Sequence, residues 1–134
     1  MSALRPQYHF RKTDRGIDAW DVGRLIELSA ALPVRQIDPT AVAELHQDHW
    51  YFQGGRVPSP ASIIEHIRLI EACDLAFPIV LGEDGRVMDG MHRICKAILA
   101  GQSTVPAVQF QSDPEPDFAN CDPDALPIPG GSAR

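Results

Sequence analysis

The segment from Pro78 to Phe110 constrains the fold more than any other part of the chain. Its first apolar run, PIVL, is typical of a buried strand, and the Asp-Gly pair in GEDGRV predicts a tight turn into a second short strand. A helix should begin near Met91, and Gly101 stands at the position after a helix that favours glycine. TVPAVQF is typical of a closing strand. We therefore expect a hairpin, a helix and a further strand in this order.

Capping patterns predict three more helices. Asp21 is placed to cap a helix that ends before Pro33. Asp38, followed by a proline, is a start signal for a second helix over TAVAELHQ. A Ser-Pro pair at Ser59 begins the third helix, in which isoleucines recur at helical spacing up to about Cys73. PVRQI, between the first two helices, is short and β-prone.

The length of 134 residues fits one domain. We expect an irregular N-terminal segment over residues 1–19, a folded domain over residues 20–111 and a flexible tail over residues 112–134. The tail is rich in proline and acidic residues, a composition that buries too little apolar surface to order a segment by itself.

Composition limits the classes of partner. The formal net charge of -6 is unfavourable for binding a nucleic-acid backbone, so a nucleic-acid partner is not expected. No apolar run approaches the roughly 18 residues of a membrane span, and the N-terminus has no apolar core of a secretory signal. We therefore expect no membrane association and a cytoplasmic location. Three widely spaced cysteines argue against a disulfide framework and a zinc site.

Most of the candidate chemistry lies in the motif Asp-Gly-Met-His-Arg, residues 89–93, at a predicted strand-to-helix turn. Gly90 permits a positive φ and lets a ligand approach the backbone. Arg93 can hold two phosphate oxygens, and His92 can donate to a phosphate or move a proton. Asp89 can bind Mg²⁺ beside phosphate oxygens. The unpaired amides at the start of a helix add to such an anion site.

A simpler interpretation is that Asp89 caps the helix and that His92 and Arg93 lie on its first-turn surface. Against it, cations are unfavourable at the positive end of a helix dipole. The residues alone leave a phosphate site and a simple cap equally open.

Weaker signals lie elsewhere. His46 and His49 share a helix face with Asp48 between them, a spacing that metal ligands can have, but no third ligand is evident. His66 is expected to face solvent from the third helix. The run Trp-Tyr-Phe at residues 50–52 can stack on a nucleobase, although such runs more often seal the edge of a core.

The run PIVLGEDGRVMDGMHRICKAILAG, followed by VPAVQF, resembles the ParB/sulfiredoxin-like superfamily. The resemblance covers Val34 to Phe110, and within the superfamily the chain is similar to small stand-alone bacterial proteins labelled ParB-like. It implies a single small α+β domain with a mixed sheet flanked by helices. It also implies that the motif at residues 89–93 binds nucleotide phosphates, so ATP, ADP or CTP is the expected ligand together with Mg²⁺.

The members of this superfamily differ in the motif. ParB partition proteins have Gly-Glu-Arg-Arg and continue into a helix-turn-helix, which makes a partition role improbable for this chain. Sulfiredoxins have Gly-Cys-His-Arg, and Met91 stands in place of their catalytic cysteine, so sulfinic-acid reduction by that route is excluded. Free-serine kinases have Asp-Gly-His-His-Arg, which this chain matches at four of five positions.

The resemblance to these kinases implies roles for individual residues. The predicted catalytic residues are Asp89, which also binds Mg²⁺, His92, and Glu44 as the base. The predicted nucleotide-binding residues are Gly90, Met91, His92, Arg93 and Arg56.

Three functions follow from these expectations. The first is a nucleotide-dependent phosphotransferase or hydrolase, with a small molecule as a possible phosphate acceptor. The second is a non-catalytic module that senses a nucleotide. The third, least favoured by the acidic charge, is a nuclease or DNA-binding protein. The sequence leaves the oligomeric state open.

Overall fold

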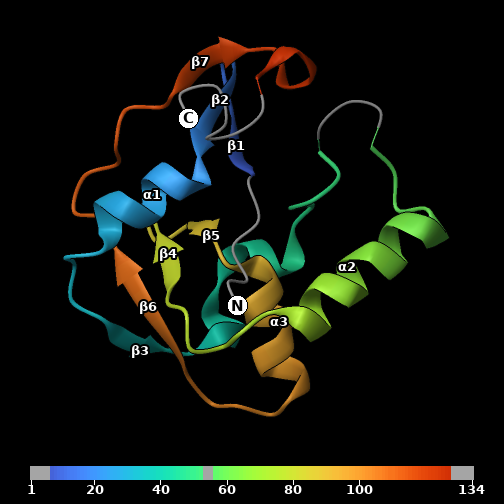
Figure 1. Cartoon of the computed structure of the whole chain (residues 1–134), viewed down its shortest axis with the longest axis vertical. Helices are drawn as coiled ribbons and strands as arrows, with labels where there is room; N and C mark the ends of the chain where they lie inside the picture. The colour runs from blue at the N-terminus through green and yellow to red at the C-terminus, as the bar shows by residue number, and fades with distance from the viewer. Residues whose placement is uncertain (1–6, 53–55, 128–134) are drawn as a thin grey trace.

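The computed structural model describes residues 7–52 and 56–127 and has an α+β fold with two sheets (Figure 1). Three α-helices, seven strands and three 3-10 turns are formed within these residues. In chain order they are β1 Tyr8–Thr13, β2 Gly16–Asp21, α1 Val22–Ser29, β3 Arg35–Ile37, η1 Pro39–Ala41, η2 Ala43–His46, α2 Pro60–Ala72, β4 Ile79–Leu81, β5 Val87–Asp89, α3 Met91–Leu99, β6 Val105–Gln109, β7 Phe118–Cys121 and η3 Pro123–Ala125.

The segment from residue 78 to residue 110 folds as its pattern predicts. β4 and β5 form the expected antiparallel hairpin, α3 follows, and β6 returns parallel to β4. With β3 on the other side of β6, the strand order is β3-β6-β4-β5. This is the mixed sheet of the predicted α+β fold, and α3 connects its hairpin to β6.

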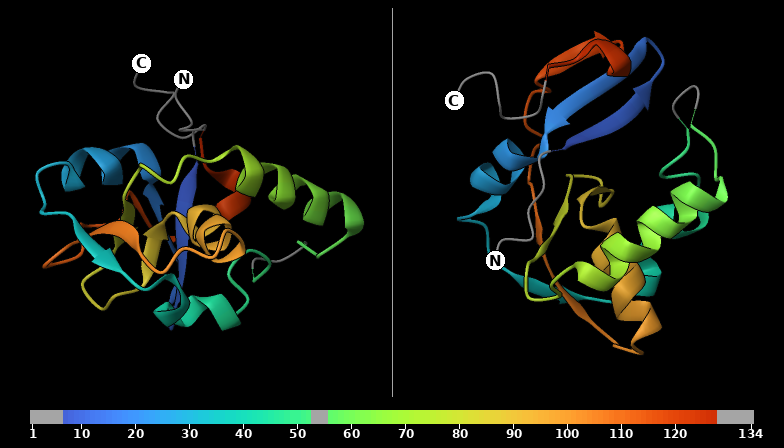
Figure 2. Two further views of the ribbon diagram at one scale, coloured as in Figure 1. Left: turned by 90° about the horizontal axis from the view of Figure 1, so that it is seen from below. Right: turned by 45° about the vertical axis from the view of Figure 1, so that its right-hand side comes forward.

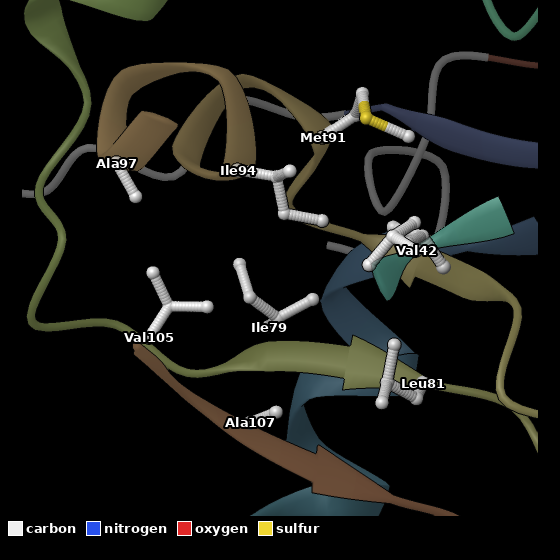
Figure 3. Close-up of a cluster of buried hydrophobic side chains, with 9 residues drawn as sticks. Val42, Ile79, Leu81, Met91, Ile94, Ala97, Val105 and Ala107 are labelled. Carbon is white, nitrogen blue, oxygen red and sulfur yellow. The ribbon is translucent and has the colours of Figure 1, made fainter. Parts of the chain in front are cut away.

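Helix α3 packs on one face of this sheet (Figure 3). Ile94 and Ala97 are completely buried, and they point toward Ile79 on β4 and toward Val105 and Ala107 on β6. Their cluster holds the start of α3 against the sheet, so the motif at residues 89–93 stands on a rigid support.

A second sheet was not expected. β1 and β2 form an antiparallel hairpin, and β7 pairs with the other edge of β2 (Figure 2). The prediction of an irregular segment over residues 1–19 is therefore wrong from residue 8 onward, while residues 1–6 lie outside the described residues. β1 and β2 pair locally, while β7 joins the other edge of β2 from about a hundred residues later, and no local pattern reveals that partner.

The prediction of a flexible tail over residues 112–134 is also wrong for residues 112–127. Hydrogen bonds and ion pairs attach this segment to the hairpin: Asp113 pairs with Arg11 at 2.9 Å, and the Trp20 indole donates to the Pro114 carbonyl oxygen at 2.8 Å. Polar contacts thus replace the apolar burial that the composition lacks. Residues 128–134 lie outside the described residues.

The helix predicted over TAVAELHQ is replaced by two 3-10 turns. Asp38 caps the first turn as expected, accepting from the Thr40 N–H at 2.9 Å. Val42 then adopts an extended conformation and inserts into the core, which interrupts the helical path. The other caps are confirmed, since Asp21 and Ser59 accept from amides in the first turns of α1 and α2. Within the described residues no helix is long and apolar enough to cross a membrane.

Candidate functional site

A cleft of about 880 Å³ lies between β1, helix α2 and the start of α3. Tyr8 and Phe10 line it from β1, and His66 and Leu69 from α2. All five residues of the motif at residues 89–93 contribute to its wall. The structure therefore places the predicted phosphate motif in a cleft, beside strand β1.

Gly90 is required by its position. It is the N-cap of α3 with φ of +117°, and a Cβ atom there would lie 2.7 Å from the Cδ1 atom of Ile79. Within the described residues no side chain caps α3, so the alternative that Asp89 caps this helix is wrong. The first amides of α3 and the positive end of its dipole are therefore directed toward the cleft.

Arg93 and Asp89 form a buried ion pair, with 2.6 Å between Nη2 and Oδ2. The other guanidinium nitrogen, Nη1, donates to the carbonyl oxygens of Phe77 and Pro78 at 2.9 Å. Arg93 thus binds α3 to the chain that leads into β4. In this geometry both terminal nitrogens of the Arg93 guanidinium bond to protein oxygens. They are therefore not available to a phosphate, contrary to the prediction that Arg93 binds one.

Asp89 does not fit the predicted role of a metal ligand. Its Oδ2 atom pairs with Arg93, and its Oδ1 atom accepts from the Gln7 amide at 3.2 Å. A guanidinium at this distance neutralises the carboxylate that would attract a cation. Among the residues that the structure describes, no group of three or more His, Cys, Asp or Glu could hold a metal ion, which includes the region of His46 and His49.

His92 and His66 form a hydrogen bond, with 2.8 Å between Nε2 of His92 and Nδ1 of His66. The Trp50 ring stacks on both imidazoles, with centroids 4.0 Å from His66 and 5.0 Å from His92. The expectation that His66 faces solvent is therefore wrong. In a histidine pair one ring donates and the other accepts, so this contact sets the tautomer of each ring.

The remaining two predicted residues lie in different places. Arg56 is exposed and lines the cleft, and its contact with nucleotide phosphates stays a prediction. Glu44 does not line it. The Glu44 side chain is buried, and its Oε2 atom accepts from the Val87 N–H at 2.7 Å. The structure therefore does not bring the predicted base to the motif.

Two further histidines near the cleft are neutral at physiological pH. Burial, with a smaller contribution from the Arg11 charge, lowers the pKa of His9 to about 3. Burial also lowers the pKa of His49, although Glu44 and Asp48 oppose this shift.

Comparison with protein-family models, curated proteins and solved structures finds no match for this chain. The chemistry of the site is therefore interpreted from its own residues. An uncapped helix start, a histidine pair and an aromatic wall can bind an anionic group that is attached to a planar, partly apolar body.

Proposed function

We propose that the protein binds a nucleotide in this cleft through its phosphates. The observation that carries the proposal is the uncapped start of α3, which meets the cleft directly beside the His92–His66 pair. The helix supplies amides to the phosphate oxygens, and His92 supplies a side-chain donor. Arg56, at the rim, adds a positive charge.

The dimensions and wall of the cleft support this ligand. Small-molecule pockets generally range from about 300 to 1,000 Å³, and the cleft has about 880 Å³. Tyr8, Phe10 and Phe52 line it together with Trp50, so apolar and aromatic surface lies within reach of the phosphate end. A nucleobase would use that surface for stacking.

For chemistry on the phosphate, the best candidates are His92 and His66. Phosphoryl transfer depends on positioning and on neutralising charge, and a histidine pair can hold an oxygen and relay a proton near neutral pH. Asp89 and Arg93 act as positioning residues because their ion pair fixes the start of α3. This division of roles supports a phosphotransferase or nucleotide hydrolase in which Glu44 is not the base.

The resemblance of the motif to the ParB/sulfiredoxin-like superfamily agrees with this proposal and favours ATP, ADP or CTP. The resemblance of the motif to the free-serine kinases also makes a small molecule the expected phosphate acceptor, if the protein is a kinase. A cytoplasmic location is part of the same proposal, since nucleotides and the three free thiols both suit a reducing compartment.

The second candidate is a nucleotide-sensing module without turnover. It is favoured by one observation: Asp89 and Arg93 neutralise each other, and Glu44 lies outside the cleft. Of the predicted charged residues, Arg56 alone then remains to act on the phosphates. The net charge of -6 still disfavours a nuclease.

A thermal-shift screen with ATP, ADP and CTP, with and without Mg²⁺, tests the binding, and measurement of product nucleotide tests turnover. A ligand at a hundred times its dissociation constant stabilises the fold by about 2.7 kcal/mol, which a thermal shift detects. Binding with product supports the enzyme, and binding without product supports the module.

The matched variants are His92→Ala, which should abolish the nucleotide-induced shift, and His46→Ala on an exposed turn, which should preserve it. Circular dichroism checks that both variants fold. If no nucleotide stabilises the unaltered protein, or if His92→Ala leaves the shift unchanged, the proposal is wrong.

A further inference from the structure

Strand β1 is an edge of the three-stranded sheet, in which the order is β1-β2-β7. Among the described residues β1 pairs with β2 alone, and the right-hand view of Figure 2 shows it on the side of β2 that faces α2. An edge strand presents a row of backbone N–H and C=O groups without a strand partner, which another extended chain can use. The direction of these groups follows from the register of β1 and β2.

The backbone groups of Tyr8, Phe10 and Lys12 face away from β2. The carbonyl oxygen of Gln7 accepts from the Val22 N–H at 3.0 Å, and the register continues from this pair without a shift. Hydrogen-bonded and non-hydrogen-bonded pairs alternate in an antiparallel ladder, so the odd-numbered residues of β1 bond to β2 and the even-numbered residues do not. The β2 residues opposite Phe10 and Lys12 pair with β7 on their other side, as this alternation requires. The outward groups of β1 have no backbone partner among the described residues.

Open space follows this edge. A smaller pocket of about 230 Å³ adjoins the cleft, and the two share four lining residues. The cleft is lined by residues 7–10 and the smaller pocket by residues 9–12. Successive side chains of a strand point to opposite faces, so a cavity lined by consecutive residues follows the edge of the strand and not one face. Six extended residues span about 20 Å, which gives room for an added strand of similar length.

The side chains beside the edge favour particular neighbours. Tyr8 and Phe10 lie on one face of β1, with ring centroids 5.9 Å apart. Aromatic residues pair well across a ladder with β-branched residues. Lys12 is exposed and lies on the same face by alternation. A residue directly opposite Lys12 on an added strand has its Cβ atom about 5 Å from that of Lys12, so an acidic residue is favoured there.

The other charged side chains of the smaller pocket already bond within the protein. Their bonds join Arg11 to Asp113, Arg86 to Asp84, Asp48 to the Tyr51 N–H and Glu44 to the Val87 N–H. Among the residues that the structure describes, the Lys12 ammonium has no ion pair or hydrogen bond. Asp48 and Glu44 lie outside β1, so the charge that an added strand meets at its own ladder position is Lys12. A cation on an edge strand disfavours nonselective pairing, and an acidic partner residue compensates it.

We propose that β1 binds an extended peptide segment of another protein, which adds to its free edge as an antiparallel strand. The segment carries an acidic residue opposite Lys12 and a β-branched residue opposite Phe10. Its backbone exchanges N–H···O bonds with the outward groups of β1 and so continues the sheet. Antiparallel order is favoured because the other ladders of this sheet are antiparallel. The inference goes beyond nucleotide binding and does not rest on it, and its test contains no nucleotide.

The probe is the peptide Thr-Glu-Thr-Val-Thr-Val-Thr with blocked ends, which places the glutamate opposite Lys12 and the valines opposite Phe10 and Tyr8. Amide chemical-shift mapping on the unaltered, isotope-labelled protein should show shifts at residues 8–12 that saturate at about millimolar peptide. A peptide methylated on the nitrogen of the first valine loses the bond to Phe10, so it should bind about tenfold more weakly. Methylation on the threonine between the valines points the methyl group away from β1 and should leave the affinity within about twofold.

The two methylated peptides have the same composition, so their difference reports a ladder on β1. If the unmodified peptide shifts none of these amides, or if both methylated peptides bind equally well, the proposal is overturned. Hydrogen exchange of the free protein is an independent check, since the amides of Phe10 and Lys12 should exchange faster than those of His9 and Arg11. Equal protection at the four amides means that the edge is already paired, and signals that broaden with protein concentration mean that a second copy pairs there. Either result overturns the proposal.

The matched variants are Lys12→Glu and Arg68→Glu. Lys12→Glu should lower the affinity for the probe about fivefold, and it should raise the affinity for a probe with lysine in place of glutamate. Arg68→Glu makes the same change in net charge at an exposed position of α2 that lines neither pocket, and it should bind the probe as the unaltered protein does. Equal losses in the two variants overturn the pairing with Lys12. Circular dichroism checks the fold, and the methylated peptides on unaltered protein remain decisive if Lys12→Glu does not fold.

Discussion

Arg93 shows how one residue can have the right position and a different role from the predicted one. Its side chain is only 9% exposed and bonds to Asp89 and to the carbonyl oxygens of Phe77 and Pro78. These partners are distant in sequence except for Asp89, one helical turn away. At the scale of the residue, the motif is a structural junction between β4, β5 and α3, and the proposed phosphate site stands on that junction.

We expect Arg93→Ala to lower the free energy of unfolding by about 3–5 kcal/mol, because it leaves Asp89 as an uncompensated buried charge. Urea unfolding measures the change. Arg68→Ala, at an exposed arginine of α2, is the control and should stay within about 0.5 kcal/mol of the unaltered protein. A loss below 1 kcal/mol for Arg93→Ala would show that the junction is not held as described.

His9 makes stability depend on pH. Its pKa is about 3 in the folded chain and 6.5 in the unfolded chain, so between these values the unfolded state binds more protons. The contribution of neutral His9 is complete above pH 6.5 and is lost as the pH falls toward 3, with a slope that approaches about 1.4 kcal/mol per pH unit. Urea unfolding from pH 7 to pH 4.5 measures the slope.

The matched variant for this prediction is His9→Phe, which keeps a ring against Trp20 but cannot be protonated. Its stability should vary less with pH over the same range. Equal slopes in the two proteins would mean that His9 is not the titrating group.

At the scale of elements, sequence signals predicted an element correctly where capping or turn residues mark its ends. Caps and turn residues predicted α1, α2, α3 and the β4–β5 hairpin. They failed for β2 and β7, which pair with each other across about a hundred residues. They also failed for the segment around Val42, where burial of one side chain outweighed the helical pattern.

The segment that precedes β7 should be loosened by removing its two carboxylate anchors, Asp113 and Asp117. Asp113 accepts from Arg11 and from the Glu83 N–H, and Asp117 accepts from Arg24 and from the Asp21 N–H. We expect Asp113→Ala with Asp117→Ala to accelerate amide hydrogen exchange in β7 and to lower the free energy of unfolding by about 1–3 kcal/mol.

The control for this double variant is Asp14→Ala with Glu27→Ala, which removes the same two negative charges from exposed positions. It should leave exchange in β7 unchanged. Equal acceleration in both double variants would attribute the effect to net charge and not to the anchors.

For the whole molecule, the decisive feature is that residues from β1, α2 and the start of α3 line one cleft. The sequence correctly predicted the Gly90 turn between β5 and α3, because this turn is local. It did not predict the meeting of His66, Trp50 and His92, since that contact joins α2, a loop and α3. For the same reason the sequence did not predict that Glu44, which bonds to the Val87 N–H, lines a pocket other than the cleft.

A ligand in this cleft should link the stability of these distant segments. Binding to the folded state alone suppresses every opening that destroys the site. Hydrogen exchange with and without ATP should therefore show slower exchange in residues 8–13, 62–69 and 90–93 together. Strand β3, Arg35–Ile37, does not line the cleft and is the internal control, whose exchange should change least. Protection confined to α3 would mean that the ligand contacts only the helix start, and the wall formed by β1 and α2 would then have no part in binding.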